Sequence, residues 1–262
     1  MEDFELALRR FSRHFEPYTD KFRLIGGAAM WLLMDSAGLP VRATKDLDIV
    51  LTIEVMNRDF GSAIWEFVRD GGYRVAQKST GRHTFCRFIE PTKPGYPVML
   101  EIFSRSPEGL ELSKMTHVIP IPVSDDISSL SAILLDDSYY SFIHEYSTVI
   151  QGIPVVTEIG LIPMKAKAWI DMTERKAAGE TIDSKNIRKH RTDVFRLSQL
   201  IEPSVRLALP PLIRNDLRSF LSRVHGEITP DVLRSAGIGM MTADSACDYI
   251  ATVFALKPTS VE

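Results

Sequence analysis

The feature that most constrains the fold is a pair of glycines between a short apolar strand and an apolar helix. Residues 22–27 read FRLIGG, and residues 28–38 read AAMWLLMDSAG. The first run is typical of a strand that ends in a tight turn, and the second predicts a helix that stops near Gly38 and Pro40. At Gly26 and Gly27 the backbone allows a ligand to approach closely, and the amides that open the following helix suit a phosphate.

A second strand, predicted at residues 46–53, begins with two aspartates, Asp46 and Asp48. Because alternate side chains of a strand share a face, both carboxylates point the same way. Two such carboxylates repel each other unless a cation lies between them, and Mg²⁺ is typically held by one or two carboxylates, with water and phosphate completing its shell. The spacing therefore favours a metal site. The alternative is that Asp46 is a turn residue and that Asp48 pairs with Lys45 or Arg42.

The order of these parts carries more information than any one of them. A strand, two glycines, a helix, the Arg-x-Thr of residues 42–44 and an Asp-x-Asp strand follow one another, and this order resembles the nucleotidyltransferase superfamily. The resemblance implies an α/β (α+β) fold with a mixed sheet and flanking helices, and Mg²⁺ (or Mn²⁺) held by Asp46 and Asp48. It also implies that an NTP is bound around the glycine turn by Gly26, Gly27, Arg42 and Thr44.

The same resemblance implies a third carboxylate from a later strand. Glu101 lies in PVMLEIFS, residues 97–104, where the flanking residues are apolar and an acid needs a partner. We therefore favour Glu101 as the third metal ligand. Asp136 and Asp137, which end the run SAILLDD, remain the alternatives.

The second half of the chain changes character and is mainly helical in its pattern. We expect an α/β domain over residues 1–160 and a helical domain over residues 161–262, with further strands in the first half at 116–123, 130–137 and 147–158. Pro163 is typical of the first turn of a helix, which would place Lys165 in that first turn, where a bound anion would offset its conflict with the helix dipole.

Two stretches of the helical half, LIPMKAKAW and KHRTDVFRL, resemble the later motifs of AbiEii/AbiGii-type nucleotidyltransferases. The resemblance implies that Lys165 and Lys189 bind nucleotide phosphate and that Asp193 is a catalytic residue, as a general base or at the acceptor site. Some members of this family are toxins of toxin–antitoxin pairs. A cognate antitoxin protein is therefore an implied partner.

Composition excludes several other classes of protein. The net charge is −3, so any nucleic-acid site must be a local patch, and the two cysteines show no metal or disulfide spacing. The first residues have the spacing of an amphipathic helix that carries both acids and bases, which is not the pattern of a signal peptide. No apolar run is long enough to span a bilayer. These features favour a cytoplasmic protein.

The leading hypothesis is Mg²⁺-dependent transfer of NMP from an NTP to an acceptor. Three acceptor classes fit: an RNA such as a tRNA end, a protein hydroxyl, or a small molecule such as an aminoglycoside. The alternative is a non-catalytic module of the same fold that binds a nucleotide or a partner protein. A metal-dependent phosphohydrolase ranks last, because it would be expected to have histidines near the aspartates.

Overall fold

The computed structural model describes residues 2–52, 57–80, 83–104, 133–134 and 136–256. The chain divides into two compact units. One comprises Met1–Val123 and Tyr146–Thr157, and the other comprises Ser124–Glu145 and Glu158–Glu262. The boundary that we predicted after residue 160 falls within the first turn of helix α6, Glu158–Ala177.

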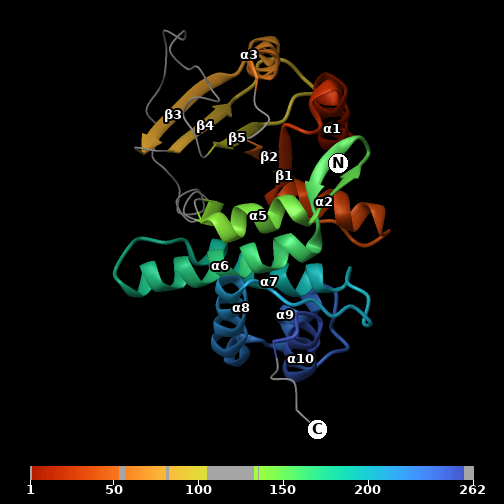
Figure 1. Cartoon of the computed structure of the whole chain (residues 1–262), viewed down its shortest axis with the longest axis vertical. Helices are drawn as coiled ribbons and strands as arrows, with labels where there is room; N and C mark the ends of the chain where they lie inside the picture. Colours follow the sequence, from red (N-terminus) through yellow and green to blue (C-terminus); the bar gives the residue numbers. More distant parts are fainter. Residues whose placement is uncertain (1, 53–56, 81–82, 105–132, 135, 257–262) are drawn as a thin grey trace. The chain divides into compact units, whose positions relative to one another are not determined.

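Within the described part of the first unit, seven strands form one mixed sheet in the order β3-β4-β5-β2-β1-β7-β6. Their bounds are β1 Phe22–Ile25, β2 Asp46–Leu51, β3 Arg74–Thr80, β4 His83–Ile89, β5 Met99–Ser104, β6 Ser147–Ile150 and β7 Ile153–Val156. The pairs β2–β5 and β1–β7 are parallel, and the other neighbouring strands are antiparallel (Figure 1). The predicted mixed sheet is confirmed.

Three helices accompany this sheet: α1 Glu2–Phe15, α2 Gly26–Ser36 and α3 Arg58–Gly71. Helix α1 buries the side that its sequence spacing predicts, including Leu8, Phe11 and Phe15. Phe11 and Phe15 lie against Phe22 of β1 and Phe67 of α3, so aromatic packing joins the helices to the sheet.

The described part of the second unit is built from helices. They are α5 Asp137–Glu145, α6, α7 Ser184–Ser198, α8 Pro211–Val224, α9 Pro230–Ala236 and α10 Ala243–Val253. Helices α6 and α7 lie side by side, and Trp169 of α6 is buried with its ring edge-on to Phe220 of α8. A mixed sheet followed by a helical second half is the fold class that the sequence predicted.

Several local predictions need correction. Helix α2 begins at Gly26, two residues before the predicted start, and the tight strand-to-helix turn is at this residue, with a φ of +67°. Helix α6 begins one turn before the predicted start, so Pro163 lies inside the helix and Lys165 is not in its first turn. The reason is that Leu161 and Ile162 are buried, and tertiary packing of the preceding turn outweighs the preference of proline for a helix start.

Of the further strands that we predicted, the run at 147–158 is confirmed as β6 and β7, and the one at 116–123 lies outside the described residues. Within 130–137, Ile133 and Leu134 are helical and buried, so the strand prediction is wrong where the structure describes it. A short apolar run does not distinguish a strand from a buried helical turn. In the part of the chain that is described, none of the helices has both the length and the apolar character needed to cross a membrane.

Candidate functional site

Three charged side chains form a row across neighbouring strands of the first unit. The register places Asp48 of β2 beside Glu101 of β5, and Glu101 beside Arg87 of β4. Residues directly opposite each other in a sheet project from the same face, so the three side chains stand together. The Glu101 Oε1 atom accepts a hydrogen bond from Arg87 Nε at 2.7 Å, and Arg87 Nη2 lies 2.5 Å from the same oxygen.

The Asp48 carboxylate also lies directly against the start of helix α2. Strand β1 pairs with β2 so that Ile25 is opposite Asp48, which brings the next residue, Gly26, under the carboxylate. A Cβ atom added to Gly26 would lie only 1.8 Å from Asp48 Oδ2, and the Gly26 backbone has a φ of +67°. Glycine is therefore required here for both space and conformation.

The neighbouring residue, Gly27, faces the segment that precedes β2. A Cβ atom at Gly27 would lie 3.1 Å from Thr44 Oγ1 and 3.9 Å from Arg42 Nη2. The structure thus brings Gly26, Gly27, Arg42, Thr44 and Asp48 together at the amino-terminal end of α2. A hydroxyl, a guanidinium and a glycine backbone that begins a helix can all bind a phosphate group.

Asp46 lies two residues before Asp48 on β2, on the predicted shared face, and both side chains are half-buried. The residue opposite Asp46 on β5 is Met99 rather than an acid. Among the residues that the structure describes, no group of three or more His, Cys, Asp or Glu side chains is arranged to hold a metal ion. The metal-ligand roles of Asp46, Asp48 and Glu101 stay predictions.

The donor chemistry of Asp46 and Asp48 nevertheless fits a hard divalent cation. Mg²⁺ is usually held by one or two protein carboxylates, with water and substrate phosphates at its other positions, so a third protein ligand is not required. Burial, first, and then the adjacent Asp48 carboxylate raise the pKa of Glu101, while Arg87 acts to lower it. A cation beside these carboxylates would stabilise their ionised forms.

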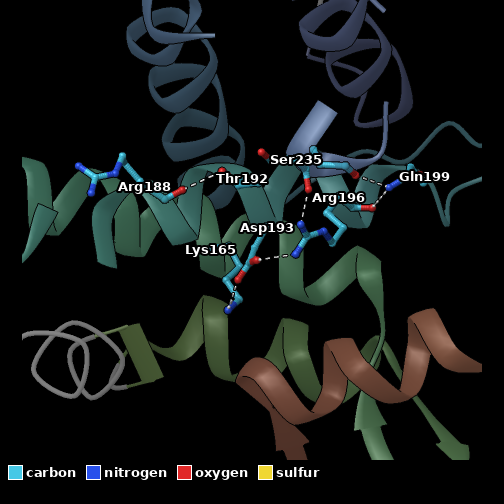
Figure 2. A network of polar contacts seen from close by, with 8 residues as sticks. Lys165, Arg188, Thr192, Asp193, Arg196, Gln199 and Ser235 are labelled. Atoms are coloured by element: carbon cyan, nitrogen blue, oxygen red, sulfur yellow. Dashed lines mark hydrogen bonds and ion pairs between the residues drawn. The ribbon is translucent and has the colours of Figure 1, made fainter. Parts of the chain in front are cut away.

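In the second unit, Lys165 of α6 and Asp193 of α7 form a buried ion pair (Figure 2). Lys165 Nζ donates to Asp193 Oδ2 at 3.1 Å, and only 6% of Lys165 is exposed. Arg196 approaches Asp193 Oδ1 to 3.9 Å and also donates to the carbonyl of Ser235 in α9. The two residues that the sequence assigned to phosphate binding and catalysis therefore contact each other and connect two helices.

Lys189, the other predicted phosphate-binding lysine, is half-buried on α7. The basic stretch around it is not a uniformly solvated face, because His190 and Arg191 are buried. Arg191 Nη1 donates to Glu227 Oε2 at 2.7 Å. The nucleotide-binding roles of Lys165 and Lys189 and the catalytic role of Asp193 stay predictions.

The alternative third carboxylates, Asp136 and Asp137, belong to the second unit. Asp136 caps helix α5, because its Oδ1 atom accepts hydrogen bonds from the backbone N–H groups of Ser138 and Tyr139 at 2.8 and 3.2 Å. A helix cap gives a complete local reason for an aspartate at this position. Glu101 is the candidate that lies beside Asp48.

Sequence reasoning missed Arg87. Arg87 lies between Cys86 and Phe88, which are both fully buried, so its side chain projects from the opposite face of the strand. The signal in the sequence was therefore a single cation within an apolar run. That pattern places Arg87 on a polar face but does not identify its partner. The partner follows from the β4–β5 register, which pairs Arg87 with Glu101.

Comparison with solved structures finds several chains that are similar to this one. The chain is similar to an antigenic nucleotidyltransferase-like protein from Paracoccidioides brasiliensis, with 14% identity and a TM-score of 0.44, over 90% of this chain and 93% of that chain. Two structures of the Cid1 poly(U) polymerase, bound to MgATP and to MgGTP, give TM-scores of 0.31 and 0.32 at 14% identity. These matches cover 80% of this chain and 56% of those chains. No family model and no curated protein matches the sequence.

Proposed function

We propose that this protein is a metal-dependent nucleotidyltransferase that transfers NMP from an NTP to a hydroxyl acceptor. In this reaction the acceptor oxygen forms a bond to the α-phosphorus, the bond between that phosphorus and the bridging oxygen to the β-phosphate breaks, and pyrophosphate leaves. The acceptor proton passes to a base or to water. A divalent cation, when bound, supplies charge neutralisation for the triphosphate and its leaving oxygen.

The observation that carries this proposal is the contact of the Asp48 carboxylate with Gly26, the first residue of α2. This contact supports the proposal because Mg²⁺ prefers carboxylate ligands and a helix start suits phosphate. We assign Asp46 and Asp48 to the metal, with Glu101 beside Asp48 as the predicted third carboxylate. We assign Gly27, Arg42 and Thr44, with Gly26, to the phosphates of the NTP.

The roles of the residues in the helical half are proposed from the sequence resemblance. Lys165 and Lys189 would add positive charge for phosphate, and Asp193 would act as a base or at the acceptor site. For Asp193 the buried contact with Lys165 provides a competing structural role, which stability measurements can separate from catalysis. A toxin role with a cognate antitoxin rests on the resemblance of the Lys165 and Lys189–Asp193 stretches to the AbiEii/AbiGii family.

Transfer is tested with the four α-³²P-labelled NTPs, with and without Mg²⁺ or Mn²⁺, against total RNA, purified tRNA, the protein itself and an aminoglycoside. We expect label to pass to one acceptor class only when metal is present. The variant with Asp46→Asn and Asp48→Asn should lose transfer by at least about a thousandfold while keeping its fold, because the metal contributes several kcal/mol to transition-state stabilisation. Equal transfer by this variant would contradict the proposal.

The alternative, a non-catalytic binding module, gives a different outcome in the same series. Such a protein binds a labelled NTP or a partner but passes label to none of the acceptors. The toxin role is checked separately by induced expression in a bacterial host. Growth arrest by the native chain, relieved by the double aspartate variant, would support it, and arrest by both chains would contradict a nucleotidyl-transfer toxin.

A further inference from the structure

Glu101 differs from Asp46 and Asp48 in its burial. The Glu101 side chain is only 8% exposed, whereas Arg87, Asp46 and Asp48 are half-buried. A charge removed from water requires a close partner, and Glu101 has one in the guanidinium. Asp46 and Asp48 keep the partial access that a cation and its water ligands need.

The geometry of the pair is also specific. Two nitrogens of Arg87, Nε and Nη2, approach the single oxygen Oε1 of Glu101 at 2.7 and 2.5 Å. The 2.7 Å contact has the distance of a charge-assisted hydrogen bond, which is stronger than one between neutral groups. The guanidinium offsets negative charge on Glu101, so the pair attracts a dication much less than an isolated carboxylate would.

The register fixes where the Arg87–Glu101 pair lies. Arg87 is on β4, Glu101 on β5 and Asp48 on β2, so Glu101 separates the guanidinium from Asp48. The positive charge of Arg87 therefore flanks the carboxylate row on the side of Glu101. On its opposite side Asp48 faces β1 and the start of α2. The β1 residue that pairs with it is Ile25, which carries no charge, and the next residue is Gly26.

We propose that Arg87, rather than a metal ion, is the counter-ion of Glu101, so that the site takes one divalent cation on Asp46 and Asp48. Arg87 is then a positioning residue that sets the number of cations. This inference rests on the proposed metal-dependent function and deepens it. It also replaces the predicted ligand role of Glu101 with a structural one.

The test is calorimetric titration of Mn²⁺ alone into the full chain and its variants. We expect the native chain to bind one Mn²⁺. Glu101→Gln leaves the Arg87 charge without its partner beside Asp48 and should weaken Mn²⁺ binding. Arg87→Met with Glu101→Gln should change the dissociation constant by less than about threefold, whereas Asp48→Asn should weaken binding by more than about tenfold, since even changes outside the metal ligands cost 10–100-fold. Arg87→Met frees the Glu101 carboxylate beside Asp48 and should tighten Mn²⁺ binding by about tenfold or add a second ion, because ligand charge sets affinity.

Two further variants keep the test decisive. If Glu101→Gln or Arg87→Met unfolds, the double variant Arg87→Met with Glu101→Gln removes both charges together and should bind one Mn²⁺ like the native chain. Arg74→Gln removes the exposed arginine that pairs with Glu90 between β3 and β4, and it should leave Mn²⁺ binding unchanged.

The outcomes separate this inference from the proposed function. If the double variant Arg87→Met with Glu101→Gln weakens Mn²⁺ binding as much as Asp48→Asn does, Glu101 is a ligand and the inference is overturned, while the metal-dependent function stands. Two Mn²⁺ ions in the native chain, or weaker binding in Arg87→Met, would overturn it in the same way. A native chain that binds no Mn²⁺ would overturn both.

Discussion

Replacing Asp193 with asparagine is expected to lower the free energy of unfolding by about 3–5 kcal/mol, because it leaves the buried Lys165 ammonium without its anionic partner. Only 1% of Asp193 and 6% of Lys165 are exposed, and their side chains meet at 3.1 Å between α6 and α7. Removal of one charge from such a pair costs more than the pair itself contributes. Urea denaturation followed by circular dichroism gives the difference.

The complementary change separates the charges from the packing. Lys165→Met keeps much of the side-chain volume and leaves Asp193 with Arg196 at 3.9 Å, so we expect a smaller loss than for Asp193→Asn. The double variant Lys165→Met with Asp193→Asn should recover most of the stability, because no uncompensated lysine remains. The matched control is Glu174→Gln, whose exposed pair with Arg223 joins α6 to α8 and should change stability by less than about 1 kcal/mol.

These variants also decide what Asp193 does. If Asp193→Asn is as stable as the native chain, the buried pair is not a stabilising link, which would contradict the structural role. If the double variant is stable but loses nucleotidyl transfer, the charge of Asp193 or Lys165 acts in the reaction, as the sequence resemblance implies. A stable double variant with native transfer would limit both residues to holding α6 against α7.

The second large effect is expected at Gly26. Gly26→Ala requires a residue with a side chain at a φ of +67°, which costs about 1–2 kcal/mol. Its Cβ atom would also lie 1.8 Å from Asp48 Oδ2, and overpacking of this kind costs about 1–3 kcal/mol more. We expect the free energy of unfolding to fall by the sum of these terms, and we expect Mn²⁺ affinity to fall because Asp48 must move.

Gly27→Ala is the matched control for this prediction. Gly27 is adjacent in α2, its φ is not positive, and its added Cβ would lie 3.1 Å from Thr44 Oγ1, where a small shift suffices. The gain in helix propensity from glycine to alanine is about 1 kcal/mol, so the net change in stability should stay within that amount. Equal losses of stability in Gly26→Ala and Gly27→Ala would show that the position of Asp48 does not depend on the absence of a side chain at Gly26.

Much of the first unit could be predicted from the sequence because its signals are local. The strand at Asp46, the helix after Gly26 and the shared face of Asp46 and Asp48 follow from periodicity over a few residues. The position of Glu101 in an apolar strand also marked it as a residue that needs a partner. The contact between Asp48 and Gly26 gives a structural reason for the order of glycines and aspartates in the chain.

The errors arose where the deciding contacts are distant in the sequence. Arg87 and Glu101 pair because β4 and β5 have a particular register, and a single sequence does not state that register. Lys165 looked like a first-turn lysine because Pro163 favours a helix start, but burial of Leu161 and Ile162 extended α6 backwards. The partner of Lys165 lies on another helix, so its burial with Asp193 was not visible in either motif alone.

The central claim is that Asp46 and Asp48 hold a divalent cation that in turn binds an NTP. The most direct measurement is thermal unfolding of the native chain and of the Asp46→Asn, Asp48→Asn variant, with each NTP, with and without Mg²⁺. A ligand at a hundred times its dissociation constant stabilises by about 2.7 kcal/mol, and each kcal/mol raises Tm by about 2–4 °C in a protein of roughly this size. We predict a Mg²⁺-dependent rise with at least one NTP in the native chain and none in the variant. An equal rise in both chains, or none in a well-folded native chain, would contradict the claim.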